Sequence, residues 1–135
     1  MASVALIACS KAKSHRPDIP CLFYLGTRFQ LALDVACKRL CTDRVFAISS
    51  KHGLIPLYES IEPYDESLVD KTVEERWEWA RGVADELPRH MRDITRIIVL
   101  AEDLYANPLR AYLPYAEYPL ANMSEEEQKA WLASC

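Results

Sequence analysis

Glycine is scarce in this sequence of 135 residues, which contains three, at positions 26, 53 and 82. Loops that cradle nucleoside triphosphates are rich in glycine, because the backbone must approach the phosphates closely. No glycine-rich stretch of this kind occurs in the chain. The sequence therefore excludes triphosphate chemistry of the P-loop type.

Long hydrophobic runs are also absent. The longest apolar stretches, residues 4–8 and 97–101, are much shorter than the roughly 20 residues that cross a bilayer. No positive charge precedes the first of them, as a secretory signal peptide would require. We therefore expect a cytoplasmic protein with no membrane partner.

The chain has no excess of basic residues and no paired cysteine motif. Its net charge is −4, which excludes the overall basic surface of a non-specific nucleic-acid binder. Its five cysteines lack the spacing of a disulfide framework. Cys37 and Cys41 have a spacing that two zinc ligands could use, but no second pair completes a tetrahedral site. We expect no metal and no other cofactor.

Of the 135 residues, 50% are hydrophobic and 27% are charged, which is typical of a globular protein. We expect a single domain that spans residues 1–135. Three short apolar runs, at residues 4–8, 45–48 and 97–100, are rich in β-branched side chains. They do not alternate with polar residues, which is typical of strands buried on both faces of a parallel sheet. We therefore predict three central strands.

Each interval between these strands contains an amphipathic pattern with helical spacing. The predicted apolar faces consist of Phe29, Leu33, Ala36, Cys37 and Leu40 in the first helix, and of Val73, Trp77, Ala80, Ala84 and Leu87 in the second. The predicted caps are Thr27 for the first helix, Thr72 with Glu75 for the second, and Ser124 with Glu127 for a C-terminal helix.

A β-α-β-α-β order favours a parallel sheet with helices on its faces. We therefore expect an α/β fold, a three-layer sandwich with a mainly parallel central sheet and a C-terminal helix. Residues 115–120 are a candidate for one more strand, and Pro119 would place it at the edge of the sheet.

Ligands of parallel sheets bind at the carboxyl ends of the strands. The loops that follow the three predicted strands are polar and contribute Ser10, Lys11, Lys13, Ser50, Lys51, His52, Glu102 and Tyr105. The three lysines would form a local positive patch suited to a phosphate or a carboxylate. The alternative is that they are ordinary surface lysines.

Three further residues have two interpretations each. His52 is either an acid, base or hydrogen-bond donor, or the cap of a turn before glycine. Tyr64 and Asp65 lie in a long loop that could cover the site. Either the ring of Tyr64 stacks on a planar ligand there, or the segment is only a turn held by Asp65. Cys9 is either a nucleophile or a packed side chain at the end of a strand, and we favour packing.

Several motifs are similar to those of a known family. They are the segment from Leu6 to Lys11 (LIACSK) with Lys13, the segment from Ile48 to Leu54 (ISSKHGL), Pro63-Tyr64-Asp65, the tripeptide at residues 118–120, and single matches at Tyr24, Phe29, Tyr105 and Leu109. Together they resemble the small bacterial and phage domains known as peroxide stress protein YaaA-like, whose function is unknown. The resemblance implies a remote similarity to the uracil-DNA-glycosylase-like fold and a role linked to nucleotides or nucleic acids. The chain departs from the family pattern at Ala101-Glu102, where a glycine is usual.

On these grounds we expect an enzyme that binds a nucleotide or a flipped-out nucleobase and cleaves or exchanges its N-glycosidic bond. The expected catalytic residues are His52, Asp65 and Glu102, and the expected substrate-binding residues are Ser10, Lys11, Lys13, Ser50, Lys51, Tyr64 and Tyr105. In this hypothesis Lys11 and Lys51 hold phosphate and His52 stabilises the departing base. Asp65 or Glu102 would position a water molecule. The alternative is a non-catalytic, DNA-associated stress-response protein that only grips phosphates, and the net acidity counts against it.

Overall fold

A computed structural model describes residues 2–9 and 13–134 of the chain. Its four-stranded sheet consists of β1 (Ala2–Ala8), β2 (Arg44–Ser49), β3 (Gly53–Pro56) and β4 (Ile94–Leu100), in the order β3-β2-β1-β4. Strand β1 pairs in parallel with β2 and β4, whereas β3 runs antiparallel to β2. The three predicted strands and their parallel pairing are confirmed.

Strand β3 was not expected from the sequence. It returns along β2 after a tight turn in which Gly53 adopts a positive φ of 68°. The positive φ favours glycine at this position, whereas the nearest atom to an added Cβ, a carboxylate oxygen of Glu86 at 2.9 Å, is the end of a flexible side chain that can move. The strand has only four residues and ends in a proline, so its sequence shows no clear alternation of apolar and polar residues that would predict a strand.

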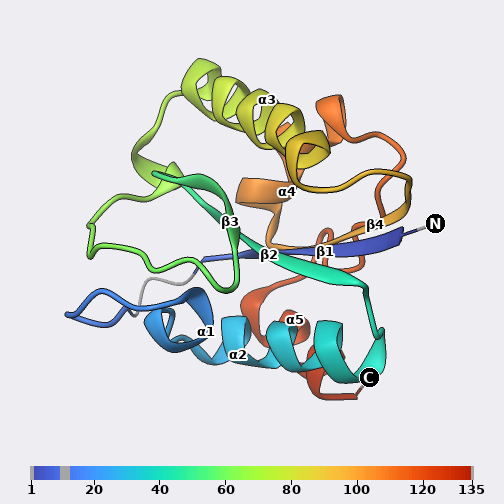
Figure 1. The fold of residues 1–135 in the computed structure, drawn as a ribbon, viewed down its shortest axis with the longest axis horizontal. Coiled ribbons are helices and arrows are strands. Elements are labelled where there is room, and N and C mark those ends of the chain that lie inside the picture. Colours follow the sequence, from blue (N-terminus) through green and yellow to red (C-terminus); the bar gives the residue numbers. More distant parts are fainter. Residues whose placement is uncertain (1, 10–12, 135) are drawn as a thin grey trace.

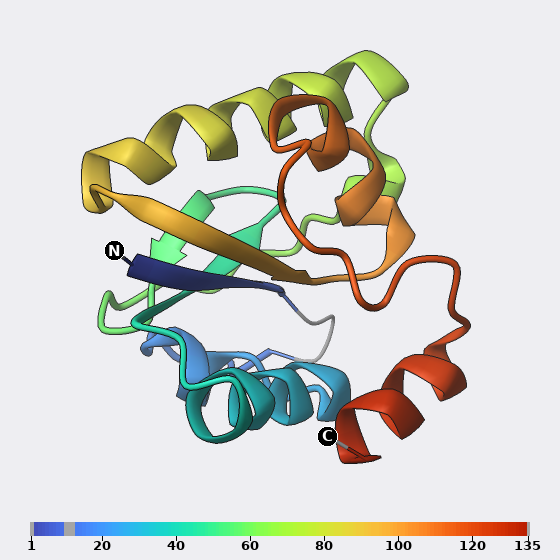
Figure 2. The same ribbon diagram turned by 90° about the vertical axis from the view of Figure 1, so that its right-hand side faces the viewer.

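Helices lie on both sides of the sheet (Figure 1). One side carries α1 (Pro20–Phe23), α2 (Thr27–Asp34) with its π-helical continuation (Val35–Arg39), and the C-terminal helix α5 (Glu125–Ser134). The other carries α3 (Val73–His90) and α4 (Asp103–Tyr112), and a short 3-10 turn (Leu68–Asp70) precedes α3. Figure 2 shows α5 beside α2, and the two helices are in contact. The mixed α/β class and the C-terminal helix are confirmed, and no helix among the described residues is long and apolar enough to cross a membrane.

Two of the three predicted helix starts are confirmed. The Glu75 N–H donates to Thr72 Oγ1 at 3.1 Å, and the Thr72 N–H donates to the Glu75 carboxylate at 2.8 Å. Ser124 and Glu127 form the same reciprocal pair before α5. Thr27 is not a cap, because it is already the first residue of α2, and the capping position belongs to Gly26.

The predicted buried face of α3 is confirmed at Ala80 and Leu87 but wrong at Val73 and Trp77, which are exposed. Trp77 has 42% of its surface exposed, and the core residues of this helix are Ala80, Val83 and Leu87. Trp79 is the tryptophan that faces inward, and its indole N–H donates to the Ser49 carbonyl at 2.7 Å. In the first crossover helix the predicted residues Phe29 and Ala36 are buried in the core, which also takes Ala32 and Val35. Of the other predicted residues, Leu33 and Leu40 are only half-buried and Cys37 is exposed.

The segment at residues 115–120 lies along β4 but forms only a single parallel bridge, between Glu117 and Ile98. The Val99 N–H donates to the Glu117 carbonyl and the Glu117 N–H to the Ile97 carbonyl, both at 2.8 Å. The Arg96 guanidinium also donates two hydrogen bonds, of 2.6 and 3.0 Å, to the Glu117 carboxylate. The expected extra edge strand is therefore reduced to this bridge.

Candidate functional site

A cavity of about 470 Å³ lies at the carboxyl ends of β1 and β4. The described residues that line it come from five parts of the chain: the segment after β1, the start of α2, the loop before α3, the start of α4, and α5. Its charged lining residues among those described are Lys13, Arg28, Glu66, Glu102, Glu125 and Lys129. The cavity is thus at the place where parallel sheets usually bind their ligands.

An ion pair between Arg28 and Glu102 forms part of the wall. The guanidinium of Arg28 donates to a carboxylate oxygen of Glu102 at 3.1 Å, and its other terminal nitrogen donates to the side-chain oxygen of Gln128 at 3.3 Å. Gln128 is buried on α5, and its amide donates in turn to the Met123 carbonyl at 3.0 Å. Gln128 on helix α5 therefore orients the Arg28 guanidinium, and this guanidinium in turn orients the Glu102 carboxylate at the cavity wall.

A thiol and a phenol are among the groups that line the cavity. Cys9 Sγ lies 3.4 Å from the hydroxyl oxygen of Tyr105, and both side chains are buried. Burial, and then the neighbouring Cys9, raise the pKa of Tyr105 far above its usual value, so the phenol stays protonated at neutral pH. Tyr105 can therefore donate a hydrogen bond but cannot serve as an anionic base there.

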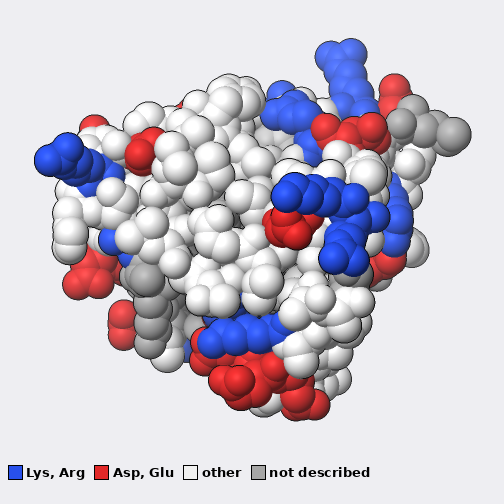
Figure 3. All heavy atoms as spheres, turned by 90° about the horizontal axis from the view of Figure 1, so that it is seen from below, with Lys and Arg blue, Asp and Glu red and all other residues white. Residues whose placement is uncertain are grey.

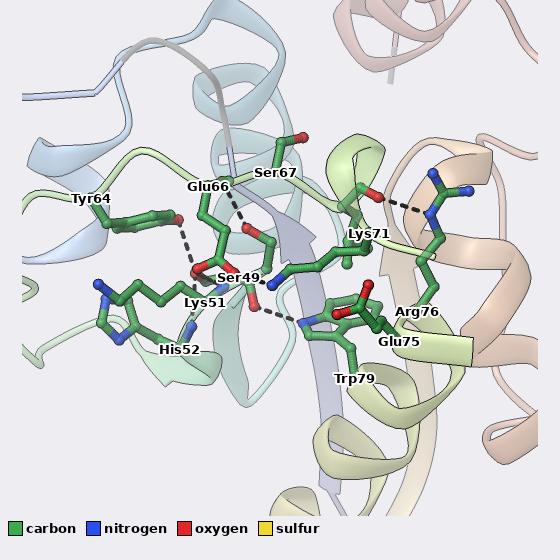
Figure 4. A network of polar contacts seen from close by, with 12 residues as sticks. Ser49, Lys51, His52, Tyr64, Glu66, Ser67, Lys71, Glu75, Arg76 and Trp79 are labelled. Atoms are coloured by element: carbon green, nitrogen blue, oxygen red, sulfur yellow. Dashed lines mark hydrogen bonds and ion pairs between the residues drawn. The ribbon is translucent and has the colours of Figure 1, made fainter. Parts of the chain in front are cut away.

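Next to the cavity, the buried residue Ser49 organises a hydrogen-bond network, seen in Figure 4. Its hydroxyl accepts from the backbone N–H groups of Lys51 at 3.2 Å and His52 at 3.1 Å, and it donates to the Tyr64 hydroxyl at 2.9 Å. Its carbonyl accepts from Trp79. We call these five residues the Ser49 network, and it ties the turn after β2 to the loop before α3 and to α3 itself.

Tyr64 is enclosed on several sides. Its hydroxyl lies 2.7 Å from that of Tyr24, its ring stacks on Phe23 at 6.1 Å, and the His52 ring meets it edge-on at 5.1 Å. The ammonium of Lys13 lies 4.8 Å from the centre of the same ring. Burial raises the pKa of Tyr64 and raises that of Tyr24 to about 12, so both phenols are neutral donors and acceptors.

His52 and Asp65 are both exposed and are not among the described residues that line the cavity. Partial burial, and then the nearby Lys51, lower the pKa of His52, which favours the neutral form of its ring. The interpretation of His52 as an acid, base or donor and its interpretation as a turn residue both remain predictions. The same holds for the role of Asp65.

The structure brings three of the predicted site residues, Lys13, Glu102 and Tyr105, to the cavity. Ser50 is buried and donates to the Glu66 carbonyl at 2.8 Å, and Lys51 is exposed. Ser10 and Lys11 lie outside the described residues, so the expected convergence of Lys11 with the turn at residues 50–52 stays a prediction.

Sequence reasoning missed four charged residues of the lining, Arg28, Glu66, Glu125 and Lys129, and Gln128 behind Arg28. Arg28 is 74 positions away from its partner Glu102, and no local motif connects them. Glu66 directly follows the Pro63-Tyr64-Asp65 motif and forms an ion pair with Lys71, so that motif indicated the correct loop. Among the described residues no group of three or more His, Cys, Asp or Glu side chains could hold a metal ion.

Residues 4–134 match DUF6884, a family of unknown function, and the chain belongs to this family. No curated protein and no solved structure matches the chain. The likeness to the peroxide stress proteins and to the uracil-DNA-glycosylase-like fold therefore remains an expectation from the sequence motifs.

Proposed function

We propose that this domain is an enzyme that binds a nucleotide or a nucleobase in the cavity and cleaves or exchanges its N-glycosidic bond. The observation that carries the proposal is the placement of Glu102, held by Arg28, beside Tyr105 at the carboxyl ends of β1 and β4. We take the domain to be the three-layer α/β sandwich expected from the sequence, with the site at one edge of its central sheet.

The size and lining of the cavity support a ligand of this class. Its volume of about 470 Å³ falls in the range of roughly 300–1,000 Å³ that is usual for sites of small organic ligands and cofactors. The aromatic residues Phe29 and Tyr105 share the lining with the charged side chains. A base with a polar edge and a sugar with hydroxyl groups would find both apolar contacts and hydrogen-bond partners there.

The chemistry needs a carboxylate and a proton donor. When the C1′–N bond breaks, its electron pair leaves with the base and positive charge develops on the sugar, as in other glycosidic cleavages. The Glu102 carboxylate would stabilise that charge and take the proton of the attacking water, whose oxygen bonds to C1′. Tyr105 would donate a hydrogen bond to the departing base, which gains a proton from solvent. In this proposal His52 and Asp65, which lie outside the cavity lining, do not touch the reacting atoms.

The test is a panel of nucleosides and nucleoside monophosphates in which free base is measured by chromatography. We expect base release by the parent protein, loss of at least about 100-fold in Glu102→Gln, and no change in Glu126→Gln, an exposed control on α5 outside the cavity lining. No base release from any substrate, or equal rates in the two variants, would refute the proposal.

A gel-shift assay with DNA at low and physiological salt tests the competing function. The face that carries α1, α2 and α5 shows acidic and basic side chains side by side, with a broad area free of charged residues, rather than a continuous basic surface (Figure 3). DNA binding through phosphates needs a basic surface and weakens steeply with salt. Tight DNA retention without base release would favour the non-catalytic, DNA-associated protein instead.

A further inference from the structure

We infer that the ligand of the cavity carries a phosphate group, bound by Arg28, Lys13 and Lys129. This inference rests on the proposed function and narrows its substrate class to phosphorylated nucleotides rather than free nucleosides or bases. The three cations come from three different elements, the segment after β1, helix α2 and helix α5, and all of them line the same cavity.

The described residues of the lining include three cations and three carboxylates, but one of these carboxylates, Glu66, pairs with a lysine outside the lining. Of the described carboxylates in the lining, Glu102 pairs with Arg28 at 3.1 Å, Glu125 with Lys129 at 3.6 Å, and Glu66 with Lys71. In contrast, Lys13 forms no ion pair with a described carboxylate, and its ammonium lies over the ring of Tyr64. An anionic ligand can therefore pair with the Lys13 ammonium without displacing a carboxylate of the lining from it.

The guanidinium of Arg28 is already oriented for an anion. Two of its nitrogens are fixed by Gln128 and Glu102, and Gln128 is itself buried and held by the Met123 carbonyl. A planar guanidinium with a fixed orientation binds phosphate oxygens through paired hydrogen bonds, and less side-chain entropy is lost on binding. Helix α5 thus contributes to the subsite twice, through Gln128 behind Arg28 and through Lys129 in the wall.

The test uses isothermal titration with inorganic phosphate, the ribonucleoside 5′-monophosphates, the matching nucleosides and a short single-stranded oligonucleotide. We expect monophosphates to bind at least about 10-fold more tightly than nucleosides. Arg28→Ala should weaken monophosphate binding about 10-fold to 150-fold, and Arg28→Lys, which keeps the charge but loses the paired geometry, should weaken it less. An oligonucleotide that binds better than the monophosphates would assign the same phosphate subsite to a nucleic-acid strand.

Lys129→Ala and Lys38→Ala form a matched pair. Each lysine pairs with an acid one turn earlier on its own helix, Lys129 with Glu125 and Lys38 with Asp34 at 3.0 Å, but only Lys129 lines the cavity. Lys129→Ala should weaken monophosphate binding several-fold, and Lys38→Ala should leave it unchanged. This pair tests the inference even if Arg28→Ala fails to fold.

The outcomes separate the inference from the proposed function. Base release at equal rates from nucleosides and monophosphates, with equal binding of both, would overturn the phosphate subsite while the proposed reaction stood. Monophosphate binding that depends on Arg28 and Lys129, without release of base from any substrate, would refute the reaction but support the subsite. Equal phosphate binding by the parent, Arg28→Ala and Lys129→Ala would overturn the inference.

Discussion

The two tryptophans of α3 offer a matched test of the fold, because they are two positions apart and differ in their surroundings. Trp79 faces the sheet, where its indole N–H donates to the Ser49 carbonyl and its ring packs edge-on against Tyr105 at 5.4 Å. Trp77 is 42% exposed, and its ring meets the half-exposed ring of Tyr112 at 6.1 Å.

Replacement of Trp79 by alanine removes a large half-buried side chain and leaves the Ser49 carbonyl without its donor. Buried Trp→Ala changes cost about 3–5 kcal/mol, and the partial exposure of Trp79 places our expectation at the lower end, about 3 kcal/mol. Trp77→Ala should cost about 1 kcal/mol, which is typical of an exposed aromatic pair. Trp79→Phe keeps most of the packing but loses the hydrogen bond, so about 1–2 kcal/mol is expected.

Urea denaturation of the parent and the three variants, followed by far-UV circular dichroism, measures these free energies of unfolding. Trp79→Ala should destabilise the protein most. Trp79→Phe should destabilise it as much as Trp77→Ala or more. A larger loss for Trp77→Ala than for Trp79→Ala would refute the assignment of the helix face and the position of α3 on the sheet.

Three further predictions concern glycine, tyrosine and histidine. Gly53→Ala should destabilise the fold by about 1–3 kcal/mol because of its positive φ. In contrast, Gly82→Ala, in a helix with free space around it, should stabilise the fold by about 0.5–1 kcal/mol in the same urea assay. Because the pKa of Tyr24 in the folded protein is raised to about 12, this side chain ionises at a lower pH in the unfolded chain, so stability should fall as the pH rises from about 10 to 12. Tyr24→Phe should make this fall less steep, whereas Tyr115→Phe should not, because the Tyr115 side chain is 98% exposed. His52 has a lowered pKa, so its NMR titration should have a midpoint below about 6.5, and its contribution to stability should be complete above that pH and decline below it; a midpoint at or above about 6.5 would contradict the structure.

The parts of the fold that depend on local patterns could be predicted from the sequence. The apolar runs became β1, β2 and β4, and the reciprocal cap of Thr72 and Glu75 formed as expected, because such a cap depends on residues three positions apart. The face of α3 was less predictable. Tryptophans at both 77 and 79 allow two overlapping apolar faces, and only packing against Ser49 selects one of them.

The position of the candidate site could be predicted from the sequence, but several of the residues that line it could not. Glu102 and Tyr105 follow a predicted strand, so the rule for carboxyl ends of parallel strands identified them. Arg28 and Lys129 have no such signal, because they reach the cavity only through the packing of α2 against α5. A contact between segments so far apart in sequence depends on tertiary structure rather than on any local motif.

The most direct test of the central claim is a crystal structure of the protein with a bound nucleoside 5′-monophosphate. We predict that the nucleotide occupies the cavity between α2, α4 and α5, with its phosphate within hydrogen-bond distance of Arg28 and its glycosidic bond beside Glu102. A nucleotide bound instead at the exposed turn of Lys51 and His52, away from Glu102, would contradict the account.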